Sequence, residues 1–240
     1  MANLDRHLVS LTAPASFAAE QYQGLRLTIE RVARSRDVKV IAVSSPAAGD
    51  GKTVTSINLA GALARGSNDR VLLIDADLRR PSVGSLLGIG REERGLADML
   101  AAGGPAFGDI LRSTPLANLS VLTAGTPRGG VSELLRSPSL DTMLRDARQR
   151  YAYVVVDTPP LLPVFDSALL AKLVDAVLLV VSANQTPRKL LGEALNMLEP
   201  SKVLGIVFNR DDRPLFGYYN SYNRYYREYF TDRSQVASGA

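Results

Sequence analysis

The chain has 240 residues, of which 46% are hydrophobic and 22% charged, and its formal net charge is +4. This composition suits a globular domain with one substantial core, and the absence of cysteine excludes disulfides and cysteine–metal sites. No apolar run has membrane-spanning length, because Asp166, Lys172 and Asp175 interrupt the most apolar region, 161–181. The N-terminus shows no secretory signal and the basic residues form no block, so we expect a cytoplasmic protein that does not bind nucleic acid.

The first predicted elements lead to a glycine-bearing loop. Residues 1–16 are predicted to form a flexible arm, and residues 17–34 an amphipathic helix. A β-branched apolar run at 38–44 predicts a strand. The loop Pro46-Ala-Ala-Gly-Asp-Gly-Lys-Thr53 follows, and a helical pattern continues from Thr53 to Arg65.

This order of strand, loop and helix is typical of a phosphate-binding P-loop. Gly49 and Gly51 allow successive backbone N–H groups to point inward and surround an anion at the start of the helix. Lys52 is placed to reach the β- and γ-phosphates of a nucleotide, and the Thr53 hydroxyl to ligate Mg²⁺. The pattern departs from the P-loop consensus at its first position, where Pro46 replaces glycine.

A second buried strand, predicted at 70–74, ends in the acidic sequence Asp75-Ala-Asp77-Leu-Arg79. In a doubly wound parallel sheet, ligands bind at the carboxyl ends of the strands, so both carboxylates are expected beside the P-loop. An alternative interpretation stays open, because an Asp-x-Asp pair after a strand is also common in ordinary turns.

The remaining segments alternate between strands and helices. Short helical pieces broken by glycine are predicted within 82–118. Further strands are predicted at 119–123, 153–156, 176–182 and 203–208, and further helices at 132–136, 139–150 and 187–198. Asp157 follows its strand in the position of a Walker B carboxylate, which would hold Mg²⁺ directly or through water. The alternation predicts an α/β fold of the P-loop NTPase type, with a mostly parallel sheet flanked by helices.

The last segment, 213–240, differs in composition from the domain predicted at 17–212. Its tyrosines are interleaved with Asn, Ser, Gly and Arg, and aliphatic residues are few: Tyr218, Tyr219, Tyr222, Tyr225, Tyr226 and Tyr229. Such a segment cannot form a core of its own and is predicted to be a flexible tail. The alternatives are an aromatic lid, a stacking surface for single-stranded nucleic acid and a low-complexity tail. The more specific hypothesis is that these tyrosines accept phosphate.

Together the motifs resemble those of the bacterial tyrosine autokinases (BY-kinases) of capsular and exopolysaccharide systems. The matching features are the P-loop at 48–53, the second Walker-type motif at 72–81, the Walker B motif at 154–160 and the tyrosine cluster. The resemblance covers residues 18–230. It implies an autokinase that uses ATP and Mg²⁺ to phosphorylate its own tail between subunits, and thereby regulates polysaccharide synthesis or export.

The resemblance also implies roles for individual residues. Lys52 would neutralise charge on the transferring phosphoryl group, Asp75 would take the tyrosine proton, and Asp77 would assist the metal. The implied catalytic residues are Lys52, Asp75, Asp77 and Arg79, and the implied Mg²⁺ ligands are Thr53, Asp77 and Asp157. The implied nucleotide-binding residues are Ala48, Gly49, Asp50, Gly51, Lys52, Thr53, Val54 and Asn209.

Partners follow from the same resemblance. Glu20 and Arg26 match the family's oligomerisation motif, although Gln23 replaces its middle arginine, so a ring-like or dimeric homo-oligomer is expected. We also expect other protein-tyrosine substrates and a separate membrane activator or polysaccharide co-polymerase that recruits the chain to the inner face of the cell membrane. Two other functions stay open. A partition- or septum-positioning ATPase would carry a lysine in place of Ala47, and a nucleotide-gated adaptor would bind ATP without forming phosphotyrosine.

Overall fold

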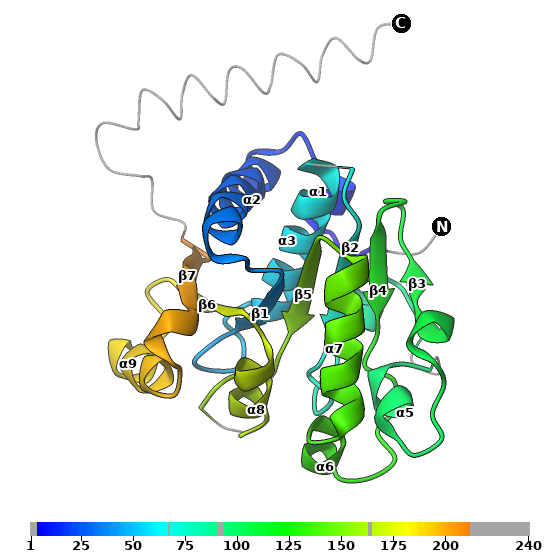
Figure 1. Ribbon diagram of the computed structural model, residues 1–240. Coiled ribbons are helices and arrows are strands. Elements are labelled where there is room, and N and C mark those ends of the chain that lie inside the picture. Colours follow the sequence, from blue (N-terminus) through cyan, green and yellow to red (C-terminus); the bar gives the residue numbers. More distant parts are fainter. Residues whose placement is uncertain (1–3, 67, 91–93, 163–164, 212–240) are drawn as a thin grey trace, which may run out of the picture.

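One seven-stranded sheet lies at the centre of the molecule (Figure 1). The computed structural model describes residues 4–66, 68–90, 94–162 and 165–211. The strands are ordered β3-β4-β2-β5-β1-β6-β7, and all neighbours are parallel except β3 and β4. Their bounds are β1 (Val40–Ser44), β2 (Val71–Asp75), β3 (Arg112–Ser113), β4 (Leu119–Leu122), β5 (Tyr153–Asp157), β6 (Ala176–Ser182) and β7 (Val203–Asn209). The predicted α/β fold with a mostly parallel sheet is confirmed.

Helices cover both faces of the sheet (Figure 1). One face packs against α1 (Val9–Thr12), α2 (Phe17–Arg36), α3 (Lys52–Gly66) and α4 (Val83–Leu86). The other face packs against α5 (Leu96–Leu100), α6 (Val131–Leu135), α7 (Pro138–Arg150), α8 (Asp166–Leu173) and α9 (Arg188–Asn196). Two short 3₁₀ turns complete the elements, η1 (Phe107–Ile110) and η2 (Pro200–Lys202). Among the described residues, no helix has the length and apolar character that crossing a bilayer demands.

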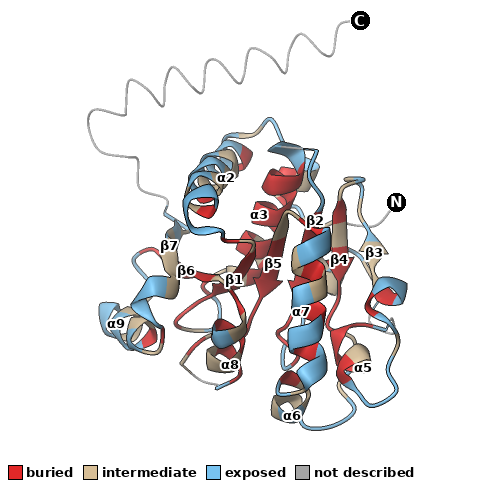
Figure 2. Ribbon diagram, in the orientation of Figure 1, coloured by how far each residue is buried: buried red, intermediate tan, exposed pale blue. Residues whose placement is uncertain are grey.

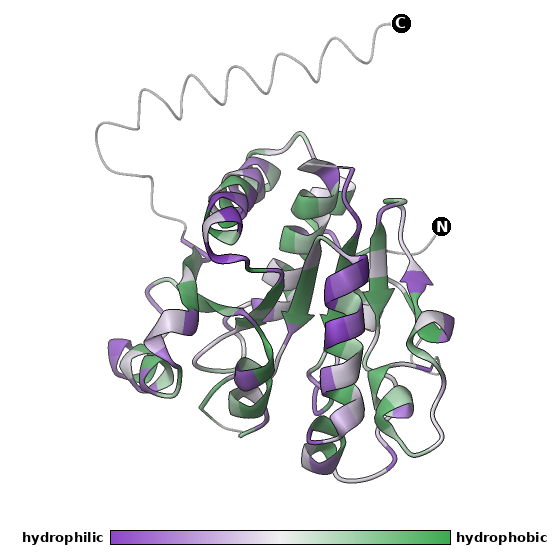
Figure 3. Ribbon diagram, in the orientation of Figure 1, coloured by the Kyte–Doolittle hydropathy of each residue, from purple (hydrophilic) through white to green (hydrophobic). Residues whose placement is uncertain are grey.

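The central strands belong to two hydrophobic cores, because successive side chains of a strand point to opposite faces. In β1, Val40 and Ala42 join the core on the α7 side, whereas Ile41 and Val43 join the core on the α3 side. Every residue of β1, β2 and β6 is buried. This explains why these strands are continuous apolar runs rather than alternating ones. Figure 2 shows the buried strands between helices whose outer faces are exposed, and Figure 3 shows the matching distribution of hydropathy.

The prediction of a flexible arm at 1–16 is wrong for residues 4–16. The Leu8 side chain is completely buried in the core that α3 also lines. The Ser10 N–H donates to Asn58 Oδ1 at 2.9 Å, and Arg65 Nε donates to the Ser10 carbonyl at 2.7 Å. Leucine burial and hydrogen bonds to α3 therefore hold this segment against the domain.

Besides α1 and η2, the strand β3 and the helix α8 were not predicted. β3 has only two residues, too few to show a period of two, and it runs antiparallel to β4. α8 lies within the apolar region 161–181, where nearly continuous hydrophobicity conceals a helical period. The predicted boundary between domain and tail at 212/213, like the tail tyrosines, lies outside the described residues.

Candidate active site

The P-loop has the backbone conformation that its glycines predict. Gly49 and Gly51 have φ angles of +94° and +93°, a region that residues with a Cβ rarely adopt. A Cβ on Gly51 would also collide with the side-chain amide of Asn209, which packs directly against the loop. The loop follows β1, and Lys52 and Thr53 are the first residues of α3. The backbone N–H groups of this turn therefore lie at a helix N-terminus, where an anion is favoured.

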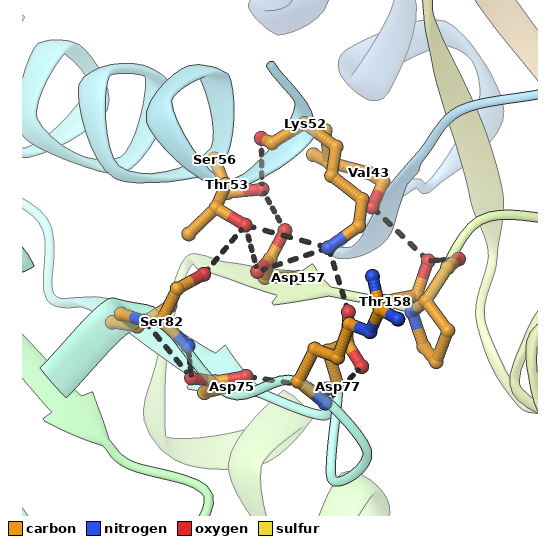
Figure 4. A network of polar contacts seen from close by, with 12 residues as sticks. Val43, Lys52, Thr53, Ser56, Asp75, Asp77, Ser82, Asp157 and Thr158 are labelled. Carbon is orange, nitrogen blue, oxygen red and sulfur yellow. Dashed lines mark hydrogen bonds and ion pairs between the residues drawn. The ribbon is translucent and has the colours of Figure 1, made fainter. Parts of the chain in front are cut away.

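Lys52 links the P-loop to the second acidic motif (Figure 4). Its Nζ lies 2.8 Å from Asp77 Oδ2 and 3.9 Å from Asp157 Oδ2. Burial acts to lower the pKa of Lys52, but the attraction of Asp157 and Asp77 outweighs burial and raises the pKa above its ordinary value. Lys52 is therefore a permanent cation at this site.

Asp157 lies beneath the P-loop at the end of β5 (Figure 4). Its Oδ2 accepts a hydrogen bond from the Thr53 hydroxyl at 2.8 Å, and its Oδ1 accepts one from Ser56 at 2.9 Å. Burial raises the pKa of Asp157 to about 6, although the Lys52 charge and the two hydroxyls act to lower it. The structure thus brings together Thr53 and Asp157, two of the three residues predicted to hold Mg²⁺.

Asp75 faces the backbone of the segment that follows it (Figure 4). One oxygen accepts the Asp77 N–H at 3.2 Å, and the other accepts the N–H groups of Ser82 and Val83 at 3.1 and 3.0 Å. Burial and the repulsion of Asp157 raise the pKa of Asp75 to about 8. The hydrogen bonds are those of the turn interpretation, and a pKa near neutrality suits a general base. The contacts of Asp75 are therefore those of the turn interpretation, and its role as a base stays a prediction.

Negative charge exceeds positive charge at this centre. The carboxylates of Asp75, Asp77 and Asp157 are 0%, 3% and 0% exposed and surround one ammonium group, that of Lys52. Carboxylate and hydroxyl oxygens are the donors that Mg²⁺ prefers in proteins. Within the ranges that the structure describes, no group of three or more His, Cys, Asp or Glu side chains is arranged to hold a metal ion.

Arg79 is held at the rim of the site by two residues that sequence reasoning missed. Its Nε is paired with Asp166 Oδ2, and one terminal nitrogen donates to Ser132 Oγ at 3.2 Å. Ser132 in turn donates to Asp166 Oδ1 at 2.8 Å. Asp166 is only 1% exposed. The sequence did contain a sign of this role, because Asp166 lies inside an apolar region. An aspartate in such a region is expected to be buried and to need a cationic partner.

A cavity of about 660 Å³ opens between the P-loop and the acidic motif. Eight of the predicted residues line it: Ala48, Gly49, Gly51, Lys52, Thr53, Val54, Asp77 and Arg79. Residues that line it without having been predicted are Arg80, Ser82, Leu86, Pro159, Pro160 and Arg210. Asp75 and Asp157 lie buried behind the wall, and Asp50 and Asn209 pack behind the loop, where Asn209 Nδ2 donates to the Asp50 carbonyl at 2.9 Å.

Comparison with known sequences places this chain in a family. A family model described as an AAA domain matches residues 38–200. The tyrosine-protein kinase YwqD of Bacillus subtilis (strain 168) is 31% identical over 223 residues, which are 91% of this chain and 93% of YwqD. The succinoglycan biosynthesis transport protein ExoP of Rhizobium meliloti (strain 1021) is 34% identical over 220 residues, 90% of this chain but 28% of ExoP. The chain thus spans nearly all of one relative and less than a third of the other.

Solved structures agree with this assignment. The chimerical protein CapA2B2 has a TM-score of 0.80 at 28% identity, over 88% of this chain and 93% of that one. The kinase domain of the Escherichia coli tyrosine kinase ETK has a TM-score of 0.79 at 27% identity, over 88% and 84%. The cell division ATPase MinD of Pyrococcus furiosus, of the class considered as an alternative, reaches a TM-score of 0.59 at 25% identity over 73% of each chain. The chain belongs to the family of bacterial tyrosine-protein kinases.

Proposed function

We propose that the protein is an ATP-dependent protein-tyrosine autokinase. The observation that carries this proposal is the 2.8 Å contact of Lys52 with Asp77 on the wall of the cavity. This contact brings the Lys52 ammonium beside the carboxylate motif to which we assign phosphoryl transfer. The relatives YwqD and ETK, both named as tyrosine kinases, support the choice of tyrosine as acceptor.

In this proposal, ATP binds with its phosphates against the backbone of residues 48–54, and Lys52 neutralises charge on the γ-phosphoryl group. Thr53, Asp77 and Asp157 fit Mg²⁺, because they offer oxygen donors whose negative charge Lys52 alone does not balance. Bound there, Mg²⁺ would neutralise phosphate oxygens. Arg79 adds a second cation at the rim, oriented by Asp166.

The transfer needs an acceptor and a base. The tyrosine oxygen bonds to the γ-phosphorus while the bond from that phosphorus to the bridging oxygen breaks, and ADP leaves. The phenolic proton passes to Asp75, whose raised pKa suits a base that works near neutral pH. Because Asp75 is completely buried, the segment from Asp77 to Ser82 must shift to admit the tyrosine hydroxyl.

The proposed acceptors are the six tail tyrosines of a neighbouring subunit. Each phosphate adds about −1.5 to −2 charges. Several of them would be repelled by Asp75, Asp77, Asp157 and the nucleotide, which would expel the tail and loosen the assembly. Contact between subunits through α2 would rely on the exposed Glu20, because Arg26 is already bonded to Gln23 and Glu30 of its own helix at 2.9 and 2.8 Å.

We also propose a cellular setting. ExoP is named as a succinoglycan biosynthesis transport protein, which supports a role for this chain in exopolysaccharide or capsule synthesis or export. A cytoplasmic location at the inner face of the membrane fits such a role, with a membrane activator or polysaccharide co-polymerase as partner. Further protein-tyrosine substrates are proposed in the same setting.

Purified protein incubated with Mg·ATP and mapped by mass spectrometry tests the proposal. Phosphotyrosine is expected within 218–229 in the wild type and nowhere in Lys52→Met, which controls for contaminating kinases. ATP hydrolysis without phosphotyrosine would contradict the kinase assignment and support the ATPase alternative. ATP binding with neither reaction would support the adaptor.

A further inference from the structure

Asp50 places a carboxylate at the apex of a loop that is built to receive an anion. Its neighbours Gly49, Gly51 and Lys52 line the cavity, but Asp50 does not. The residue is 5% exposed, although it lies between two glycines in a surface loop. A carboxylate directed at bound phosphates would repel them, since like charges a few ångströms apart interact strongly in a partly buried site. Some other part of the structure must turn this side chain away.

Thr186, in the turn after β6, supplies that contact. Its hydroxyl donates to Asp50 Oδ1 at 2.6 Å, while Asp50 Oδ2 accepts the Ala47 N–H at 3.2 Å. The first bond has this direction because carboxylate oxygens only accept hydrogen bonds. The Ser182 N–H donates to Thr186 Oγ1 at 2.9 Å, which uses a lone pair of that oxygen and leaves its one proton for Asp50.

The turn that carries Thr186 is itself well anchored. The N–H groups of Gln185 and Thr186 both donate to the Ser182 carbonyl, at 3.1 and 3.0 Å. Ser182 ends β6, and β6 pairs in parallel with β1, the strand that leads into the P-loop. The hydroxyl of Thr186 is therefore presented to Asp50 from an anchored turn at the end of the adjacent strand.

We propose that Thr186 is a positioning residue of the nucleotide site, which holds the Asp50 carboxylate away from the phosphates of a bound nucleoside triphosphate. The inference rests on the proposed binding of ATP. The expected effect on nucleotide binding depends on the charge of the nucleotide. Losing the hydroxyl should weaken ATP binding more than ADP binding, because repulsion from Asp50 grows with the number of phosphate charges. A loss of P-loop shape alone would weaken both nucleotides alike.

Thr186→Val tests the inference, because valine keeps the shape and removes the hydroxyl. Titration calorimetry of the full chain, with and without Mg²⁺, should give ATP binding at least about ten-fold weaker, equivalent to about 1.4 kcal/mol. ADP binding should weaken less, and Thr186→Ser, which keeps the hydroxyl, should bind ATP as the wild type does. If Thr186→Val does not fold, Thr186→Ala replaces it in the same series.

Removal of the Asp50 charge distinguishes a loss of carboxylate positioning from general damage to the nucleotide site. In an Asp50→Asn background, Thr186→Val should cost much less ATP affinity than in the wild-type background, because no carboxylate is left to turn toward the phosphates. Equal losses in both backgrounds, or equal losses for ATP and ADP, would overturn the inference. A wild-type chain that binds no ATP would overturn the proposed function instead, so the two failures are distinguishable.

Discussion

Removal of the Asp157 charge should stabilise the nucleotide-free protein, although Asp157 is expected to serve the reaction. Burial raises the pKa of Asp157 from the ordinary 3.8 to about 6. The folded protein therefore holds this proton more tightly than the unfolded chain does. The resulting contribution to stability is complete below pH 3.8 and is lost as the pH rises through 6. At neutral pH the ionised carboxylate thus lowers the free energy of unfolding.

The size of the effect follows from the same values. The difference between 3.8 and 6 corresponds to about 3 kcal/mol of destabilisation above pH 6. Asp157→Asn removes this cost but weakens the hydrogen bonds from Thr53 and Ser56, a loss of about 1 kcal/mol. The net gain of about 2 kcal/mol at pH 7.5 should raise the Tm by about 4–8 °C in a domain of this size. At pH 4.5, protonation of Asp157 in the wild type already removes part of this destabilisation. The stability gained by Asp157→Asn should therefore be close to zero at that pH.

Thermal unfolding followed by circular dichroism, at both pH values and in EDTA without nucleotide, measures this difference. Asp141→Asn is the matched control, because Asp141 is exposed and is paired with Arg145 on the surface of α7. It should leave the Tm nearly unchanged. A lower Tm for Asp157→Asn at pH 7.5, or the same shift at both pH values, would refute the reasoning. Added Mg·ADP should then stabilise the wild type more than the variant, because a ligand that binds only the folded state raises the Tm.

The remaining predictions concern the reaction. Lys52→Met should abolish phosphotyrosine, measured by mass spectrometry, while the circular dichroism spectrum stays native; undiminished labelling would exclude the P-loop assignment. Asp75→Asn should stop transfer but keep Mg·ATP binding in calorimetry, and the wild-type rate should rise toward pH 8 as the base ionises; equal loss of binding in Asp75→Asn would argue against a base. Active protein with all six tail tyrosines replaced by Phe should label Lys52→Met protein in trans, and light scattering should show smaller particles after phosphorylation; an unlabelled partner would contradict transfer between subunits.

The fold could be predicted from the sequence because the patterns that mark its strands and motifs are local. Each of β1, β2 and β5 is a short, mostly apolar run, and Asp75 and Asp157 are the last residues of β2 and β5. The N-terminal arm was missed although a signal existed, since Leu4, Leu8 and Leu11 recur at the spacing of one helical face. All three leucines belong to or pack against the core on the α3 side.

The supporting contacts of the site could not be predicted in the same way. The Asp166–Arg79 and Thr186–Asp50 pairs join residues 87 and 136 positions apart in the chain. No local pattern identifies which threonine or aspartate of a later loop will meet the P-loop, because that depends on strand order. β6 lies next to β1 in the sheet, although four strands separate them in the sequence. Side-chain pairing at the edge of a parallel sheet thus becomes visible only after the topology is known.

Each of the four carboxylates around the P-loop has its own partners. Thr186 holds Asp50, backbone N–H groups hold Asp75, and the hydroxyls of Thr53 and Ser56 hold Asp157. Asp77 is paired with Lys52, and both residues line the cavity. A phosphate group that binds Lys52 must therefore compete with Asp77, and under the proposed function the displaced carboxylate would be free to bind Mg²⁺. Nucleotide and metal binding should consequently be cooperative, and each should strengthen the other in calorimetry.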